Sequence, residues 1–559
     1  MSNFLDSINR FAQSPVGLDI GRSKFNRPFN HKTTFSSGKL IPLYWDEVLP
    51  GDTFKVDMAA VVRSITPAVP VMDNSFLDIF FFFVPNRLAC IHPNDWAEVC
   101  GENNSGYWAQ TAEKTLFNTG NYIALKTLGS NEEGTGIQPG SIANYLGMPV
   151  LTASECDSFA LSGGNSVNIN NLPFKAYEKI WNEWFRDQNT QSPSALDDHE
   201  YFSKSYVLPV NKVHDYFTSA LPAPQKGDSV LLPLGESAPV LAGTETNHVS
   251  SAALMWNQVG GSSPVRTQSG IGISSYGETS KFNSSFTGNG TIAPANLYAD
   301  LAAATAASIN SIRLAFALQR FAEKQGLGGT RYREVLKSFF GVTIPDLTVQ
   351  VPEYLGGFRK PLNITQVLQT SETSTTPLGT TGAFSNTGFT NTGFTKSFNE
   401  FGIIMCVACV RTMQSYSQGI AKKFMRNRRF DFYWPTFANL GEQPIYKSEL
   451  YVKANPTLKD GAVFGYQEAW AEYRYNPSLI TGYFAPDAGD PTLTAWTYTN
   501  NFTANPVLNS DFMKQPASQI DDTLVVQDGN YQFIGDFEFY VKCVRPMPLY
   551  SIPGLIDHH

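Results

Sequence analysis

The sequence predicts a mainly β protein, a sandwich or barrel of short strands interrupted by large insertions. Strand-like runs lie near both ends of the chain, at 49–87 and within 402–559, with helical patterns and long polar stretches between them. Regular short strands with long connections favour a sandwich or barrel. The 44 glycines and 34 prolines predict many turns. One interrupted sheet fold explains this order better than a row of separate domains.

The segment 49–87 shows the strand pattern most clearly. Apolar and polar side chains alternate at 54–58, which is the period of a half-buried strand. At 75–84 the alternation gives way to an apolar run that contains four phenylalanines, 80–83. A strand that is apolar on both faces is covered on both faces. We therefore expect a buried hairpin across a proline-rich turn, with 80–83 in the core.

Three segments in the middle of the chain carry helical spacing: 172–188, 296–325 and 331–340. The glycines after 325 follow a helix and do not join a strand to one, so they predict a C-cap and not a phosphate loop. Strand-like runs return at 403–411, 431–434, 446–452 and 537–544.

Two polar stretches and a basic terminus predict surface segments. The stretch 236–295 is rich in Ser, Thr, Gly and Asn, and is too long for an ordinary connection. A second stretch, 370–398, contains the repeat NTGFTNTGFT. Residues 1–40 hold six basic side chains against two acidic ones, which indicates a solvated basic arm or one that binds a polyanion.

The composition favours a protein whose surface is largely covered by partners. Only 16% of residues are charged, whereas there are 40 Phe and 24 Tyr, and interface cores are depleted in charge and enriched in aromatics. The six cysteines include one C-x-x-C, Cys406 and Cys409, inside an apolar run that predicts buried thiols. Neither a secretory signal nor an apolar span of membrane length is found, so we expect a protein made in a reducing cytoplasm.

No enzyme signature is present: no HExxH, no GxSxG, no Walker loop and no EF-hand. We therefore expect no catalysis, no cofactor and no metal site. A carbohydrate-binding adhesin remains an alternative, although such a protein would be secreted. A jelly-roll glycosidase would need two carboxylates at matched separation in a cleft.

One cluster, 421–437, joins positive and aromatic side chains in the sequence AKKFMRNRRFDFYWPTF. Positive side chains neutralise phosphates, and aromatic faces stack on unpaired bases. A basic loop that meets an acidic neighbouring subunit is an equally good explanation. With the N-terminal arm, the sequence yields these candidate nucleic-acid contacts: Arg22, Lys24, Arg27, Lys422, Lys423, Arg426, Arg428, Arg429, Phe430 and Trp434.

A series of motifs resembles the major capsid protein family of gokushoviruses, the Microviridae branch of small single-stranded DNA phages. They are LPGDT, PAVPVMDN, FFFVPNR, LPFKAYEKIWNEWFRDQN, HDYFTSALPAPQKGD, NLYADL, GGTRYREVLKSFFGV, PEYLGG, DFYWPTFANLGEQ, FGYQEAWAEYRYNPSLITG and RPMPLYSIPGLIDHH. These blocks cover most of 1–559 in one order. The stretches that depart most from the family are 236–295 and 370–398.

The resemblance implies one eight-stranded antiparallel jelly roll over 1–559 with long insertions of helices and loops. It implies a T=1 icosahedral shell around a circular single-stranded DNA genome, with 236–295 as the protrusion at the threefold axes and 370–398 as a variable surface loop. The implied partners are further copies of the chain, a scaffolding protein, a pilot protein, a small DNA-binding protein and a receptor on the bacterial surface. Assembly in the host cytoplasm and residence in the virion, with no membrane, follow from the same resemblance.

Overall fold

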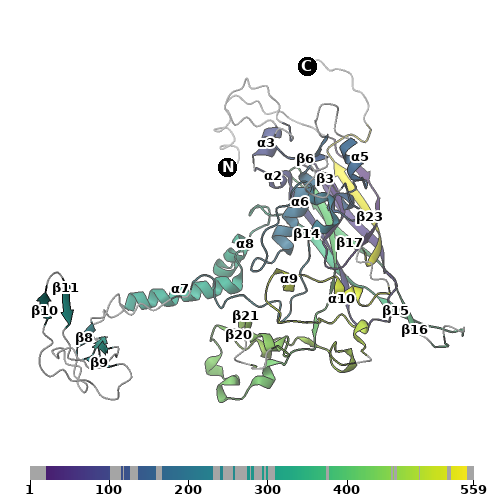
Figure 1. The fold of residues 1–559 in the computed structure, drawn as a ribbon. Helices are drawn as coiled ribbons and strands as arrows, with labels where there is room; N and C mark the ends of the chain where they lie inside the picture. The colour runs from purple at the N-terminus through teal and green to yellow at the C-terminus, as the bar shows by residue number, and fades with distance from the viewer. Residues whose placement is uncertain are drawn as a thin grey trace, which may run out of the picture. The chain divides into compact units, whose positions relative to one another are not determined.

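The computed structural model comprises two compact units, Met1–Pro224 with Thr330–His559, and Gln225–Gly329 (Figure 1). The residues that it describes are 21–92, 94–100, 115–116, 119–125, 136–158, 167–228, 230, 240–242, 256–258, 273–276, 279–282, 292–294, 297–299, 309–372, 377–379, 381–454, 458, 462–489, 492–525 and 531–550. Antiparallel sheets dominate the larger unit, which confirms the expectation of a mainly β protein.

Two sheets form the centre of the larger unit. The first has the order β1 (Ser23–Asn26), β23 (Phe533–Arg545), β4 (Thr53–Ser64) and β17 (Thr387–Ser397), and β2 (Phe29–Phe35) also pairs with β23. The second has the order β14 (Glu353–Pro361), β5 (Ser75–Pro85), β18 (Gly402–Thr412) and β3 (Ile41–Val48). All pairings within these two sheets are antiparallel.

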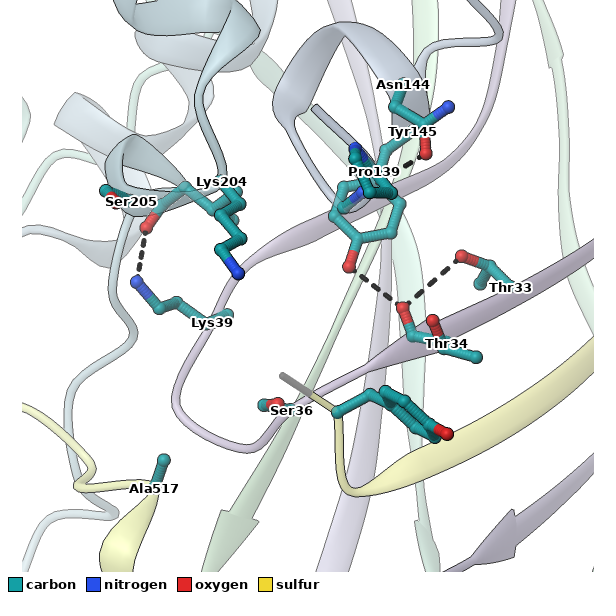
Figure 2. A pocket seen from close by; sticks show the side chains of 13 residues that line it. Thr33, Thr34, Ser36, Lys39, Pro139, Asn144, Tyr145, Lys204, Ser205 and Ala517 are labelled. Atoms are coloured by element: carbon teal, nitrogen blue, oxygen red, sulfur yellow. Dashed lines mark hydrogen bonds between the residues drawn. The ribbon is translucent and has the colours of Figure 1, made fainter. Parts of the chain in front are cut away.

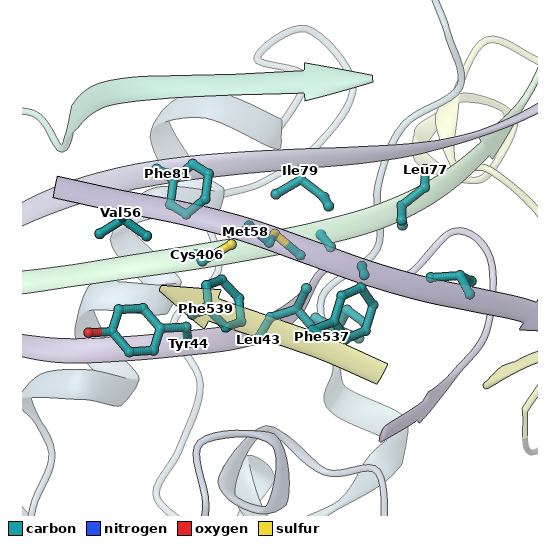
Figure 3. Close-up of a cluster of buried hydrophobic side chains, with 14 of the residues drawn as sticks. Leu43, Tyr44, Val56, Met58, Leu77, Ile79, Phe81, Cys406, Phe537 and Phe539 are labelled. Atoms are coloured by element: carbon teal, nitrogen blue, oxygen red, sulfur yellow. The ribbon is translucent and has the colours of Figure 1, made fainter. Parts of the chain in front are cut away.

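The main hydrophobic core fills the space between these sheets (Figure 3). Along β4 every second residue is buried, so that Phe54, Val56 and Met58 point inward, as the alternation at 54–58 predicts. Ile79 and Phe81 of β5 meet them from the other sheet. Burial of this many large apolar side chains is the dominant stabilising term for the unit.

Strand β5 is buried on both faces, which confirms the prediction for its phenylalanines. Phe81 and Phe83 enter the core between the sheets, whereas Phe82 belongs to a second cluster on the opposite face. Phe80 is half-buried and packs against that second cluster. Helix α6 (Leu172–Ile180) and the π-helical turn η1 (Trp181–Phe185) contribute large side chains to this cluster. An insertion of the same chain therefore covers the outer face of β5.

The expected hairpin at 49–87 is wrong in its pairing. β4 and β5 belong to different sheets and share no ladder; each pairs with strands from much later in the chain. The physical reason is that the connection at 65–74 is long and contains Pro67 and Pro70, whereas a hairpin needs a tight turn. The chain crosses from one sheet to the other instead.

The predicted helices are found with shifted bounds. The segment 172–188 forms α6 and η1, and 331–340 forms α8 (Tyr332–Val335) with η4 (Leu336–Phe340). In the smaller unit, α7 (Ile309–Gly328) ends in the expected glycines but begins later than predicted, because Leu297–Ala299 is strand β13, paired with β8 (Val240–Ala242). Most of 236–295 lies outside the described residues. Its described pieces are β8, β9 (Trp256–Gln258), β10 (Ile273–Tyr276), β11 (Thr279–Phe282) and β12 (Ile292–Pro294).

Two segments expected to be irregular contain strands. Within 370–398, β16 (Thr381–Ser385) forms a hairpin with β15 (Ile364–Leu368), and β17 lies in the first sheet beside β4. The loop expectation is therefore corrected for most of 381–397, because backbone ladders form here despite polar side chains. Residues 1–20 lie outside the described part, and the described remainder of the arm includes strands β1 and β2.

A third hydrophobic cluster is formed mainly by residues from the last third of the chain. It contains residues of β20 (Glu442–Tyr446) and β21 (Val463–Glu468) together with Tyr216 and Phe512. The strands predicted at 431–434 and 446–452 are wrong. Residues 432–434 lie between two 3-10 turns, η6 (Arg429–Asp431) and η7 (Pro435–Phe437), and a third turn, η8 (Lys447–Glu449), follows directly after β20. The carboxylates of Asp431 and Glu449 accept hydrogen bonds from nearby backbone amides and hold η6 and η8.

The remaining elements connect or flank the sheets. They are α2 (Asn86–Ala89), α3 (Asp95–Val99), β6 (Tyr122–Leu125), α4 (Ile142–Tyr145), α5 (Ala153–Ser158), β7 (Val167–Asn170), η2 (Glu200–Phe202), η3 (Lys204–Tyr206), β19 (Ser415–Tyr416), η5 (Lys422–Met425), η9 (Ala471–Tyr473), β22 (Ser478–Leu479), η10 (Gly482–Phe484), η11 (Thr494–Trp496), α9 (Ser510–Met513) and α10 (Ser518–Asp521). No disulfide joins the six cysteines, all of which lie in the described part of the chain. Cys406 and Cys409 are buried in separate clusters, which confirms the prediction that both thiols are buried.

Candidate nucleic-acid interface

The basic aromatic segment 421–437 is a loop of short turns held by its own polar groups. Met425 is buried and anchors η5. The Oδ2 atom of Asp431 accepts hydrogen bonds from the backbone N–H of Asn427 at 2.9 Å and of Arg428 at 3.0 Å. The single acidic residue of the segment therefore closes the turn that carries its arginines.

Indole groups fix the second half of the segment. Trp434 Nε1 donates to the backbone oxygen of Arg429 at 3.0 Å, and Trp470 Nε1 donates to that of Phe437 at 2.8 Å. Tyr433 packs edge-on against the ring of Trp470, with 5.7 Å between ring centroids. Trp470 is buried and directly precedes Ala471 of the third cluster, so these contacts attach the loop to the buried part of the unit.

Large aromatic faces remain exposed once the backbone is held. Between 41% and 75% of the surface of each of these side chains is exposed: Phe424, Phe430, Phe432, Tyr433 and Trp434. Tyr473, from the segment after β21, is exposed beside Tyr433, with 6.2 Å between their centroids. An exposed apolar patch of this kind marks an interaction surface.

Arg426 differs from the other cations of the segment because it is an intramolecular contact. Its Nη2 lies 2.9 Å from Oε1 of Glu472, and the two side chains are only 11% and 12% exposed. The guanidinium also lies over the ring of Tyr473, 4.3 Å from the centroid. Arg426 therefore has a structural role in this subunit, and its contact with nucleic acid stays a prediction.

The remaining cations face outward to different degrees. Lys422 donates to the backbone oxygen of Pro444 at 3.1 Å. Lys423, Arg428 and Arg429 are exposed, and no ion pair with another described residue is found for them. Arg429 lies over the ring of Trp434 at 5.3 Å from its centroid, so charge and stacking surface adjoin.

A buried carboxyl lies in the layer beneath this surface. Glu449 accepts a hydrogen bond from the backbone N–H of Tyr446 at 2.9 Å and one from Tyr216 Oη at 3.3 Å. The pKa of Glu449 is raised to about 7, chiefly by burial and to a smaller extent by the charge of Glu472, while Lys422 and the two hydrogen bonds oppose the rise. The site therefore holds a group that titrates near neutral pH.

Sequence comparison supplies the wider context for this surface. The family model described as "Capsid protein (F protein)" matches residues 16–555. The chain belongs to this family. It is 37% identical to capsid protein VP1 of Bdellovibrio phage phiMH2K, over 97% of both chains. It is 34% identical to capsid protein VP1 of Chlamydia phage 1 over 98% of both chains, and to that of Spiroplasma virus 4 over 96% of both.

These matches establish a structural role for the chain. The relatives are capsid proteins of Microviridae phages, not enzymes, so the chain is a phage capsid protein and a component of the virion. A capsid requires many copies of its subunit. The alternatives of an adhesin and a glycosidase are therefore not carried further.

The basic residues of the N-terminal segment lie elsewhere in the larger unit. Lys24 and Arg22 are exposed at the β1 edge of the first sheet, while Arg27 forms an ion pair with Asp46. Among the described residues, no hydrogen bond, ion pair or ring contact joins these three to 421–437. The capsid protein thus presents two separate basic regions.

Sequence reasoning missed the residues that complete the surface from the later segment 464–482. The residues Trp470, Glu472 and Tyr473 come from the run AWAEYRY, whose dense aromatic content was the available signal.

Within the described residues no group of three potential metal ligands is found. None of the described helices is both long and apolar enough to cross a membrane.

Proposed function

We propose that this capsid protein is the jelly-roll subunit of a T=1 icosahedral shell that encloses a circular single-stranded DNA genome. The strand order supports the jelly roll. If β1 and β2 count as one interrupted strand on β23, each sheet has four strand positions, and successive strands β3, β4 and β5 alternate between the sheets. Eight antiparallel positions in two packed sheets with long connections are typical of viral jelly rolls.

Exposed aromatic and basic side chains on 421–437 carry the DNA part of the proposal. Arg428 and Arg429 supply positive charge and Phe430 supplies an open ring face, 64% exposed. This combination binds single strands without demanding a particular sequence. The basic residues of the N-terminal region, Arg22 and Lys24, form a second contact area.

The charge contribution can be tested with the double variant Arg428→Ala/Arg429→Ala. Binding of a dT20 oligonucleotide to the purified subunit should weaken, and the slope of log K against log salt should fall by about 1.4, because each lost phosphate contact to a single strand contributes about 0.7. The matched control is Arg63→Ala/Lys179→Ala, which removes two exposed charges that belong to neither basic region, one on β4 and one on α6. If DNA binding and packaged DNA are unchanged in the first variant, 421–437 is a contact between subunits instead.

The stacking contribution can be separated from charge with Phe430→Ala. Affinity for dT20 should fall by about 1–3 kcal/mol, since stacking on one ring contributes that much per base. Affinity for an abasic strand of equal length should not change. Phe384→Ala, on the exposed face of β16, is the control. An equal loss for both strands would contradict base stacking.

The remaining parts of the proposal concern the outside of the shell and its assembly. We propose that 236–295 forms a threefold protrusion that meets a receptor on the bacterial surface, and that assembly in the host cytoplasm uses a scaffolding protein. A pilot protein and a small DNA-binding protein complete the proposed virion. Deletion of the middle of 236–295 should spare assembly, seen as uniform particles by electron microscopy, and reduce adsorption to host cells. Failure to assemble would assign this stretch to the shell.

A further inference from the structure

A cavity of about 600 Å³ lies apart from the basic aromatic surface, among the end of β2, the region of α4 and the turn η3 (Figure 2). Its lining contains two lysines, Lys39 and Lys204, and six residues that carry hydroxyl groups. None of the described residues that line it is an aspartate or a glutamate. The cavity is therefore positive and lined by hydroxyl groups, of which those of Thr33 and Tyr145 already donate to the backbone oxygen of Thr34.

Lys39 is a mostly buried cation on a rigid backbone. The neighbouring amides of Gly38 and Leu40 donate to the backbone oxygens of Val410 at 3.1 Å and of Leu208 at 2.9 Å. The amine of Lys39 donates to the Val207 oxygen at 3.2 Å, which leaves it further protons to donate. Among the described residues no carboxylate forms an ion pair with it.

The charge of Lys39 is therefore poorly compensated within the subunit. Burial lowers its pKa, and the nearby positive charge of Lys514 lowers it further. Lys514 is itself paired with Asp511 at 2.9 Å. A buried charge is costly unless a counter-charge accompanies it, so an anion in the cavity would be stabilised.

Hydroxyl groups on the opposite side complete the cavity. Figure 2 shows Lys39 and Lys204 on one side and the Thr33–Thr34 segment with Tyr145 on the other. Tyr145 Oη already donates to the Thr34 oxygen at 2.9 Å, so its ring is held as a wall. The volume exceeds what a bare oxyanion needs and lies in the range of small-molecule sites.

We propose that this cavity binds the phosphate group of a nucleotide, either free or within a DNA strand. Lysines are well suited to phosphate as point charges, and hydroxyl donors suit its several oxygens. The strand form rests on the proposed enclosure of DNA, whereas the free form does not. The cavity is separate from 421–437, so the proposal for the cavity and the proposal for DNA binding by 421–437 can fail independently.

Lysine footprinting of the full-length subunit tests the proposal. The protein is acetylated briefly with and without inorganic phosphate, deoxyadenosine monophosphate or dT20, and modification is read by mass spectrometry. Lys39 and Lys204 should be protected, while the exposed Lys179 on α6 should not be. Equal modification of all three lysines in every arm would overturn the proposal. If the monophosphate protects the two lysines and dT20 does not, the ligand is a free nucleotide. If both protect them, the cavity also binds a phosphate within a DNA strand.

Two variants make the assignment specific. Lys39→Gln should weaken binding of the monophosphate about tenfold or more, as loss of a charge-assisted hydrogen bond does, and Lys179→Gln should leave it unchanged. Ser205→Asp places a carboxylate in the lining and should abolish binding while the subunit stays folded. Unchanged binding in both cavity variants would overturn the proposal. Protection that needs assembly but no phosphate would do so as well, because it would make the cavity a subunit contact.

Discussion

The strand β5 and the segment 421–437 are both rich in aromatic residues, yet the protein uses them in opposite ways. In β5 no charged residue stands between Asp78 and the end of the phenylalanine run. The rings of Phe81, Phe82 and Phe83 are fully buried in two hydrophobic clusters. Phe430 and Phe432 alternate with charged residues and stay exposed. Aromatic content alone does not tell a buried strand from an exposed surface. The charged residues between the aromatic residues do: they are absent from the buried run and present in the exposed one.

The largest expected effect in this comparison is that of removing a buried ring. Phe81→Ala should lower the free energy of unfolding of the subunit by about 4 kcal/mol, because it removes apolar contacts and leaves a cavity between the sheets. Denaturant unfolding of the unassembled subunit measures this. Phe430→Ala removes an exposed ring and should change the free energy of unfolding by less than about 0.5 kcal/mol. Similar losses for both would remove the distinction.

A pH effect is expected in the layer that supports the exposed rings. The pKa of Glu449 is raised from its usual 4.5 to about 7 in the folded protein, so the folded state holds an extra proton between these values. Its contribution to stability is therefore present below about pH 4.5 and lost as pH rises through 7, by up to about 3 kcal/mol. In Glu449→Gln this part of the pH dependence should vanish. An unchanged difference between pH 5 and pH 8 would contradict it.

A smaller effect separates two arginines of the same segment. Arg426→Ala should destabilise the subunit by about 2 kcal/mol, since it leaves Glu472 largely buried without its partner. Arg428→Ala, two positions later, should change stability by less than about 0.5 kcal/mol because that side chain is exposed. Thermal and denaturant unfolding of the two variants, side by side, provide the measurement. A reversed order would show that the pair with Glu472 contributes no stability.

Much of the strand content could be predicted from side-chain periodicity. The alternation in β4, the apolar run of β5 and the long strand β23 all follow from it, because burial on one or both faces dictates which positions are apolar. The polar strand β17 could not be found in this way. Gly393 allows it to lie against β4, since a Cβ there would meet the Val56 oxygen at 2.8 Å.

The sequence by itself determined the mainly β class, the buried phenylalanines, the structural cysteines and the candidate basic aromatic segment. Only the tertiary structure decided that β4 and β5 lie in different sheets, and that Arg426 is paired while Arg429 is exposed. The physical reason is that local pattern reports which side chains avoid water. Pairing of strands and of charges depends on residues hundreds of positions apart, which meet only when the chain is folded.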